Sequence, residues 1–253
     1  MIDLNSFVGA WPSHVVEGQA EVVWGQLRSL GVNQIFVSPL ESCWGRNPHA
    51  FNSPLYEKAF QVSDVWPVPV LDPTVETWAK ELDRAVLQHQ VELVRLLPNY
   101  HGYNLADVEG FLAAVHASGL GVVVQVCMED SRRHHPLAVV PNVPIADVFA
   151  IAEKMPEMKM VIGGGKAGEV RAMKDRVSDL PNLYFDTAQV DGLDAVKVLV
   201  DDGMGLQLVF GSHAPLLVPH AAITRIVTDL DDETALAILE GNAQRLLGET
   251  LTV

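Results

Sequence analysis

The strongest constraint on the fold of this chain is the alternation of short apolar segments with amphipathic segments, repeated eight times along its 253 residues. The apolar or alternating runs predict strands over residues 1–7, 33–39, 65–73, 91–97, 121–128, 158–163, 182–187 and 206–212. The other segments predict helices over 20–30, 55–62, 74–90, 105–118, 144–154, 192–201, 221–230 and 232–247, and one that ends at residue 180. Thr74 is the expected N-cap of its helix.

Strands that alternate with helices over short connections run parallel, because each crossover helix returns the chain to the same end of the sheet. Eight such units in a chain of this length favour a closed (β/α)8 TIM barrel, an α/β fold, over an open doubly wound sheet. No change of composition and no Pro- or Ser-rich linker divides the sequence. We therefore expect a single barrel domain over residues 1–253.

The charge balance limits the expected partners. Acidic residues outnumber basic ones 32 to 17, for a formal net charge of −15. No Lys/Arg-rich segment is present to neutralise phosphates, so neither nucleic acid nor an anionic membrane is expected as a partner. A small-molecule substrate, including an anionic one held by a few arginines, is the expected ligand, and the outer helices are compatible with a homo-oligomer.

Two cysteines, Cys43 and Cys127, form neither a disulfide framework nor a zinc-type spacing, and free thiols fit a reducing cytosol. The first residues lack a basic stretch before an apolar core, so no signal peptide is expected. No apolar run approaches the roughly 20 residues that span a bilayer. The sequence therefore predicts a cytoplasmic protein.

Residues with reactive or charged side chains gather where the predicted strands end, and TIM barrels carry their active sites at these ends. The densest span is 125–136, Q-V-C-M-E-D-S-R-R-H-H-P, which leads into a loop over 128–144 that is long for a βα connection. The candidates for catalysis are His213, Glu129, Asp130 and Asp186. The candidates for substrate binding are Arg95, Asn5, Trp11, Asn99, Tyr100, His101, Gln125 and Arg132.

Three of these candidates have two interpretations each. Arg95 lies in the apolar segment V-E-L-V-R-L-L-P, so its buried charge needs either a substrate anion or a structural ion pair with an acid such as Glu129. His213 follows L-V-F-G-S and is either a general acid or base, or an imidazole bonded to the backbone. Asp186 either orients His213 from the neighbouring strand or caps the following loop or helix.

Other groups give weaker signals. The segment G-G-G-K at 163–166 could admit a ligand near the backbone but lacks the spacing of a P-loop. Cys127 is expected to be an inert core thiol. His134, His135 and His220 are expected at the surface.

Three segments resemble the amidohydrolase-related (amidohydrolase-2) family of TIM barrels: I-D-L-N-S-F-V-G-A-W-P at the start, L-V-F-G-S-H-A-P, and the later E-G-N-A-Q-R-L-L-G. The resemblance covers essentially the whole chain and implies a barrel with its pocket at the carboxyl ends of the strands. It also implies an opening Asp-x-His-x-His in metal-dependent members. Here Asn5 and Phe7 stand at the two histidine positions.

The resemblance further implies histidines at the ends of the fifth and sixth strands and an acid after the eighth. Here these positions hold Gln125 or Cys127, Gly163 and His213. Phenylalanine cannot coordinate a metal and asparagine is a poor zinc ligand, so no metal and no other cofactor is expected. The sequence resembles a divergent branch of the family that lacks the usual metal ligands.

Three functions remain open. The first is an enzyme, a metal-independent hydrolase or lyase that acts on a small carboxylated or otherwise anionic substrate. In this hypothesis Arg95 and Arg132 hold the anion, His213 is the general acid or base and is oriented by Asp186, and Glu129 or Asp130 is the second proton-transfer group. The second is a pseudoenzyme that binds a ligand or a partner protein. The third keeps a metal on rearranged ligands drawn from His213, Glu129, Asp186 and His101.

Overall fold

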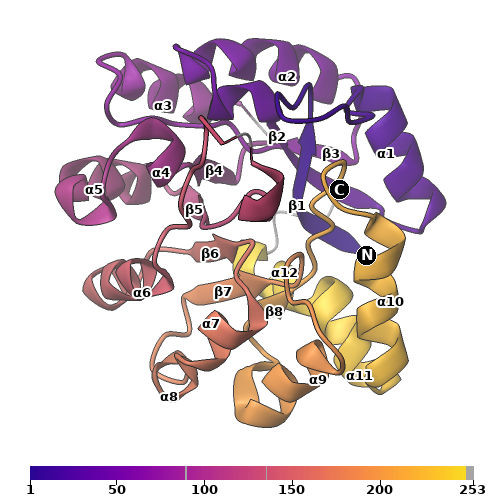
Figure 1. The fold of residues 1–253 in the computed structure, drawn as a ribbon. Helices are drawn as coiled ribbons and strands as arrows, with labels where there is room; N and C mark the ends of the chain where they lie inside the picture. The colour runs from indigo at the N-terminus through magenta and orange to yellow at the C-terminus, as the bar shows by residue number, and fades with distance from the viewer. Residues whose placement is uncertain (89, 135, 249–253) are drawn as a thin grey trace.

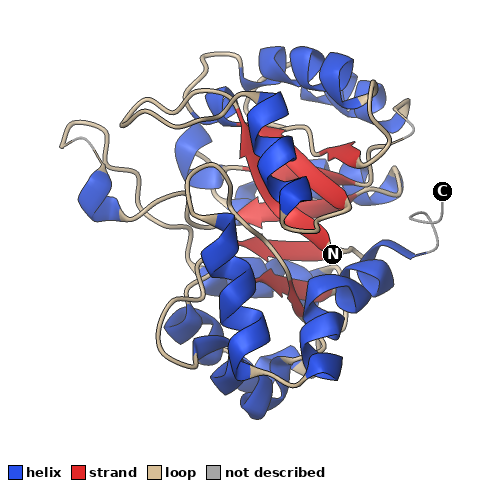
Figure 2. Cartoon of the chain, turned by 90° about the vertical axis from the view of Figure 1, so that its right-hand side faces the viewer, coloured by secondary structure: helices blue, strands red, loops and turns tan. Residues whose placement is uncertain are grey.

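The computed structural model describes residues 1–88, 90–134 and 136–248. Within these ranges eight parallel strands surround a central axis, and helices form the outer layer (Figures 1 and 2). The strands are β1 (Ile2–Val8), β2 (Gln34–Pro39), β3 (Val65–Pro67), β4 (Leu93–Leu96), β5 (Gly121–Gln125), β6 (Met160–Gly163), β7 (Leu183–Asp186) and β8 (Leu208–Val209). The helices are α1 (Ala20–Ser29), α2 (Asn52–Ala59), α3 (Trp78–Val86), α4 (Pro98–His101), α5 (Glu109–Ala117), α6 (Ile145–Lys154), α7 (Ala167–Arg171), α8 (Lys174–Val177), α9 (Ala195–Leu199), α10 (Pro219–Asp229), α11 (Asp232–Leu236) and α12 (Asn242–Leu247).

Backbone hydrogen bonds close the strands into a barrel. The strands pair in the orders β1-β2-β3 and β4-β5-β6-β7-β8. A parallel bridge between Val70 and Arg95 joins the two groups on one side. On the other side Leu4 N donates to Phe210 O at 3.0 Å, directly after β8. The α/β TIM barrel predicted from the sequence is confirmed.

Apolar side chains fill both ends of the barrel. Near the starts of the strands, Leu93 and Val161 pack with Leu246 of α12. Near their carboxyl ends, Phe7 and Met128 belong to a second cluster. The polar candidates for the site lie at this second end, where the side chains that follow the strands converge.

Most strands are shorter than the sequence predicts, and β3 and β8 differ most. β3 covers three residues of the predicted segment 65–73, because Pro67 and Pro69 have no N–H to donate to a ladder. β8 covers two residues of the predicted 206–212, since Phe210 N donates to Ile238 O instead of continuing the sheet. In both segments the chain still forms part of the barrel wall, although the regular strand is short.

The helix boundaries also differ from the prediction. α3 begins at Trp78, so the prediction of Thr74 as its N-cap is wrong: Thr74 N and Oγ1 instead donate to Asp72 Oδ1 at 2.9 and 2.8 Å. The predicted end of this helix includes His89, which lies outside the described residues. The predicted helix over 232–247 is interrupted by a wider π-helical turn, and a short helix that was not predicted, α4, follows β4. Every helix in the described part of the chain is too short or too polar to span a bilayer.

Gly164 lies directly after β6, at the carboxyl-terminal end of the barrel. Its φ is +73°, and a Cβ atom there would lie 2.3 Å from the backbone oxygen of Cys127. We expect Gly164→Ala to lower the free energy of unfolding in urea by at least about 1–2 kcal/mol, the cost of the left-handed conformation alone. Gly110→Ala in α5 is the matched control, because a Cβ there meets nothing within 4 Å. Equal effects of the two substitutions would contradict this account.

Candidate active site

Arg95 reaches from β4 across the carboxyl-terminal end of the barrel. Its side chain is fully buried, and its Nε donates to Ser38 Oγ of β2 at 2.7 Å. Its Nη1 donates to Asn5 Oδ1 of β1 at 2.9 Å and to Gln125 Oε1 of β5. The guanidinium carbon lies 4.5 Å from the centroid of the Phe7 ring, a cation–π geometry. Side chains of four strands are therefore joined through one cation.

The charge of Arg95 persists although no carboxylate among the described residues forms an ion pair with it. Burial lowers the pKa of Arg95 to about 10, against the attraction of Asp186 and Asp3. The guanidinium is thus protonated at neutral pH. The ion pair with Glu129 that the sequence left open is not formed, because the hydroxyl and amide oxygens around Arg95 take its hydrogen bonds.

Asn5 connects Arg95 to the other polar residues of the barrel end. Its Oδ1 accepts from Arg95, and its Nδ2 donates to Asp186 Oδ2 and lies 3.4 Å from His213 Nδ1. Asp186 also accepts from the backbone N–H groups of Gly164 and Ala188, each at 3.1 Å. Burial raises the pKa of Asp186, and these donors oppose the increase. Of the two roles left open for Asp186, a direct contact with His213 is replaced by a bridge through Asn5, whereas the bond from Ala188 N caps the loop that follows β7.

His213 is held on both ring nitrogens. Its Nε2 lies 2.6 Å from Met128 O, and its Nδ1 faces Asn5, which fits a tautomer with the proton on Nε2. The ring packs edge-on against Phe7 at a centroid distance of 5.1 Å, and the backbone is left-handed with φ +56°. Burial lowers the pKa of His213 to about 4, and the nearby Arg95 charge acts in the same direction. The imidazole is consequently neutral at physiological pH.

Asp3 and Ser212 form a buried pair that the sequence analysis missed. Ser212 N and Oγ donate to the two oxygens of Asp3, at 2.9 and 2.5 Å. Burial raises the pKa of Asp3 to about 6 against these bonds. The acid of the Asp-x-Asn-x-Phe segment was visible in the sequence, but its partner lies 209 positions away.

Glu129 forms a second cluster, above the buried residues. It follows β5 and is 6% exposed. Its carboxylate accepts from Ser13 Oγ at 2.9 Å, and its oxygens lie 3.6 Å from His14 Nδ1 and 3.7 Å from His134 Nε2. The prediction of His134 at the surface is wrong, because its side chain is only 4% exposed. Three loop residues that the sequence analysis did not select thus surround this acid.

A small cleft of about 100 Å³ opens beside Glu129. Two cations, Arg133 and Lys166, line it together with acids and apolar side chains. The complete lining comprises His14, Met128, Glu129, Asp130, Arg133, Lys166, Gln189, Asp191, Leu216 and Leu217. The cleft therefore contains both a buried carboxylate and positive charge, the elements needed to bind an anion and move a proton.

Two predicted site residues pair with each other at the surface. Arg132 Nε donates to Asp130 Oδ2 at 2.8 Å, and this arginine lowers the pKa of the Asp130 carboxyl well below its usual range. Asp130 borders the cleft, whereas Arg132 is largely exposed. Asn99 is also directed elsewhere, since its Nδ2 donates to Pro141 O at 2.8 Å and so fixes the loop after β5.

The aromatic and histidine candidates after β1 and β4 pack among other loops. Trp11 and Tyr100 stack edge-on at a centroid distance of 6.2 Å, and both also contact Trp44. His101 lies 2.9 Å from Ser42 O and 3.7 Å from Asp72 Oδ2. Burial lowers the pKa of His101, so its position fits a neutral, structural imidazole.

The glycines at the end of β6 and directly after it accommodate protein side chains. A Cβ at Gly163 would lie 2.4 Å from Gln125 Oε1, and Gly164 gives its N–H to Asp186. Gln125 itself donates from Nε2 to Cys127 O at 2.7 Å. Cys127 is buried, and burial raises the pKa of its thiol, which fits the expected inert thiol. Of the histidines expected at the surface, His220 is exposed and His135 lies outside the described residues.

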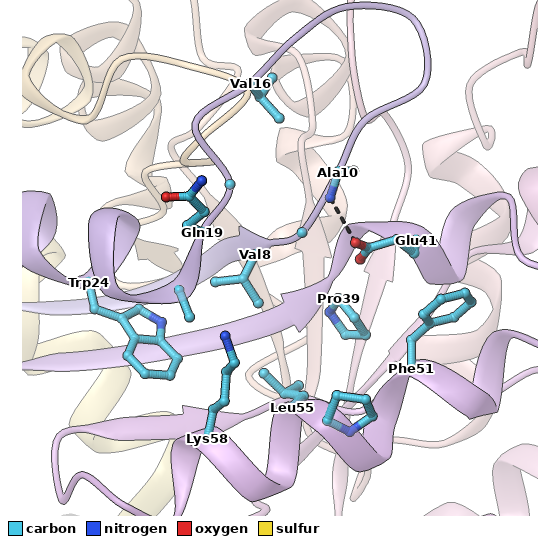
Figure 3. Close-up of a pocket in the computed structure, with 14 residues that line it drawn as sticks. Val8, Ala10, Val16, Gln19, Trp24, Pro39, Glu41, Phe51, Leu55 and Lys58 are labelled. Atoms are coloured by element: carbon cyan, nitrogen blue, oxygen red, sulfur yellow. Dashed lines mark hydrogen bonds between the residues drawn. The ribbon is translucent and has the colours of Figure 1, made fainter.

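A larger groove of about 510 Å³ lies between α1, α2 and the ends of β1 and β2 (Figure 3). Trp24, Leu55 and Phe51 give it a mainly apolar lining, and Lys58 lies at its edge. Glu41 closes one side by accepting from Ala10 N at 2.8 Å. The residues described around this groove include none of the candidates selected from the sequence.

The parallel barrel with polar residues at the carboxyl ends of its strands is the architecture of TIM-barrel enzymes. The family model described as amidohydrolase matches residues 59–248, which is well over half of the chain. The chain therefore belongs to the amidohydrolase-2 family, as its sequence motifs predict. No curated protein matches it.

Solved structures share the fold at low sequence identity. A protein described as amidohydrolase II has a TM-score of 0.74 and 18% identity, and the match covers 97% of this chain and 99% of that one. The 2,6-dihydroxybenzoate decarboxylase from Rhizobium has a TM-score of 0.72 and 14% identity over 98% and 99% of the two chains. The manganese-bound 5-carboxyvanillate decarboxylase from Novosphingobium aromaticivorans has a TM-score of 0.69 and 10% identity over 88% and 79%.

The depressed pKa of His213 predicts a pH-dependent contribution to stability. In the unfolded chain the imidazole has a pKa of about 6.5 and binds a proton more readily than in the folded state. The contribution of the neutral ring to stability is therefore complete above that pH and is lost as the pH falls towards 4. We expect the cost of His213→Asn in urea denaturation to shrink between pH 7 and 4, by up to on the order of 3 kcal/mol. Asparagine tolerates the left-handed backbone, so it isolates the ring. A cost that does not change with pH would contradict the prediction.

Proposed function

We propose that this chain is a metal-independent lyase or hydrolase that acts on a small carboxylated substrate by acid–base chemistry. The observation that carries the proposal is the environment of Glu129, a buried carboxylate within 3.7 Å of two imidazoles at the edge of a cleft. Imidazole and carboxyl groups are the usual general acids and bases of proteins, and a carboxyl group beside an imidazole can exchange a proton with it. Glu129 is the proton-transfer residue in this proposal.

The cations of the cleft support a carboxylate as the substrate class. Lys166 and Arg133 line the same cleft as Glu129, and charge-assisted bonds to a carboxylate are among the strong hydrogen bonds of proteins. Two of the structurally similar proteins are named as decarboxylases of aromatic carboxylates. In such a reaction the bond to the carboxyl carbon breaks, CO2 leaves, and the electron pair left on the ring carbon takes up a proton. Glu129, with His14 or His134 beside it, would supply that proton.

The buried candidates have a different part in the proposal. His213 is a positioning residue, because both ring nitrogens are engaged and the imidazole holds Met128 next to Glu129. Asp186 fixes Asn5 and the turn at Gly164. Neither needs to contact the substrate to shape the cleft.

The size of the cleft implies that two loops separate when substrate enters. Its volume of about 100 Å³ is below the roughly 300 Å³ at the lower end of small-molecule pockets. The loop that carries Ser13 and His14 meets the loop that carries Glu129 through the 2.9 Å hydrogen bond from Ser13 Oγ. Breaking this bond frees the carboxylate and widens the entrance.

A second function, ligand binding without catalysis, is favoured by the burial of the polar residues at the barrel end. Arg95, Asp186 and His213 have no exposed surface, and their mutual bonds are those of a structural network. In this alternative the cleft binds a carboxylate at Lys166 and Arg133, and no bond is broken.

We expect Glu129→Gln to lower kcat at least about 100-fold, because it removes the proton-transfer group and retains the shape. The assay is release of CO2 from a panel of aromatic carboxylates that includes 2,6-dihydroxybenzoate and 5-carboxyvanillate. Glu153→Gln is the control, since Glu153 forms an exposed ion pair with Arg176 and should leave the rate unchanged. An undiminished rate in the Glu129 variant would exclude its proposed role.

Calorimetric titration of the same panel separates the two functions. Binding without turnover that is lost in Lys166→Met identifies a carboxylate-binding protein. Turnover that is lost in Glu129→Gln identifies the enzyme. Neither binding nor turnover with any member of the panel contradicts both proposals.

A further inference from the structure

The end of the barrel already contains a fixed cation, and its surroundings are specialised to hold it. Arg95 is buried with hydrogen bonds to Ser38, Asn5 and Gln125 and with the Phe7 ring against its guanidinium. These partners come from β1, β2 and β5, so the cation is bound by much of the barrel wall.

The charge balance of the barrel end depends on this cation. Asp186 and Asp3 are both fully buried, and the attraction of each raises the pKa of Arg95 against burial. Asn5 connects the first of these acids to the guanidinium by accepting from Arg95 and donating to Asp186. Without Arg95, two buried acids would lose the positive charge nearest to the network.

A divalent metal does not fit the same place. One similar solved structure contains bound manganese, and divalent ions of this kind need free oxygen ligands, such as carboxylates, or free imidazole nitrogens. Here the side-chain oxygens of Asn5 and Gln125 are occupied by Arg95 Nη1, and Phe7 offers no donor atom. The carboxylate of Asp186 is occupied by Asn5 and by two backbone N–H groups. A metal placed among these groups would also be repelled by the guanidinium.

One atom of the guanidinium remains without a partner. Among the described residues, Arg95 Nη2 is buried and has no hydrogen-bond acceptor. A buried donor is costly to leave unpaired. The guanidinium is thus a cation that can still donate hydrogen bonds. In this respect it resembles a metal ion that keeps one coordination position open.

We infer that the Arg95 guanidinium takes the place of a divalent metal as the resident cation of the barrel end. This inference gives the structural reason for the metal independence stated in the proposed function, and it rests on that part of the proposed function alone. Its test uses no turnover, so the inference and the proposed reaction can fail separately.

The first measurement is made on the unaltered chain. Protein purified without chelator should contain well below one equivalent of zinc, manganese or iron by elemental analysis. Its Tm should change neither with EDTA nor with added Mn²⁺ or Zn²⁺. One equivalent of metal per chain, or a Tm that falls with EDTA, would overturn the inference even if no variant can be purified.

The second measurement asks whether the guanidinium itself is needed. Arg95→Ala should lower the Tm, and millimolar guanidinium chloride should raise it again by roughly 2–4 °C, the shift expected when a ligand exceeds its dissociation constant a few-fold in a chain of this size. Sodium chloride and Mn²⁺ at the same concentrations should not. Leu96→Ala is the matched control, because it removes a fully buried side chain from the same strand without removing a charge.

The comparison of the two variants decides the test. A guanidinium response confined to the Arg95 variant supports the inference. A folded Arg95→Ala that is stabilised by Mn²⁺, or that responds to guanidinium no more than Leu96→Ala does, overturns it.

Discussion

The guanidinium of Arg95 has to be solvated by the protein, because no solvent-exposed surface reaches it. A buried charge of this kind is stable only when hydrogen-bond acceptors surround it. Asn5, Ser38 and Gln125 supply the acceptors, and each of them is then fixed in orientation. The orientation of Asn5 in turn decides which atom faces Asp186 and His213. One buried charge thus sets the positions of side chains on most strands of the barrel end.

This network limits where reactive chemistry can occur. His213 and Asp186 use their polar atoms on neighbouring groups, and burial keeps the imidazole neutral. Glu129 differs because it lies at the edge of the network, where the loops after β1 and β5 meet and a cleft opens. The buried network and the outer acid are connected through Met128, whose backbone oxygen bonds to His213.

The fold could be predicted from the sequence because it depends on local patterns. The alternation of strands and helices identifies the barrel, and the polar residues at strand ends identify the end at which the candidate site lies. Details that depend on long-range contacts could not be predicted. Asn5 lies between Asp186 and His213 because residues 181 and 208 positions apart meet there. His14 and His134 surround Glu129 because two irregular loops fold together, and no periodic pattern marks such loops. Proline shortened β3 for a reason that was visible in the sequence, whereas the π-helical turn before α12 had no local signal.

The overall charge of the chain places a further condition on an anionic substrate. A net charge of −15 repels a carboxylate at long range, but salt screens exposed charges beyond about 10 Å at 0.1 M ionic strength. Inside the cleft Lys166 and Arg133 face acids that include Glu129 and Asp130, so the cations there are partly neutralised. Arg132, which lies outside the cleft, reduces this neutralisation because it pairs with Asp130. In the proposed function, the affinity for a carboxylate would therefore depend on the immediate surroundings of Lys166 and Arg133, and the acidic composition of the whole chain would not prevent binding there.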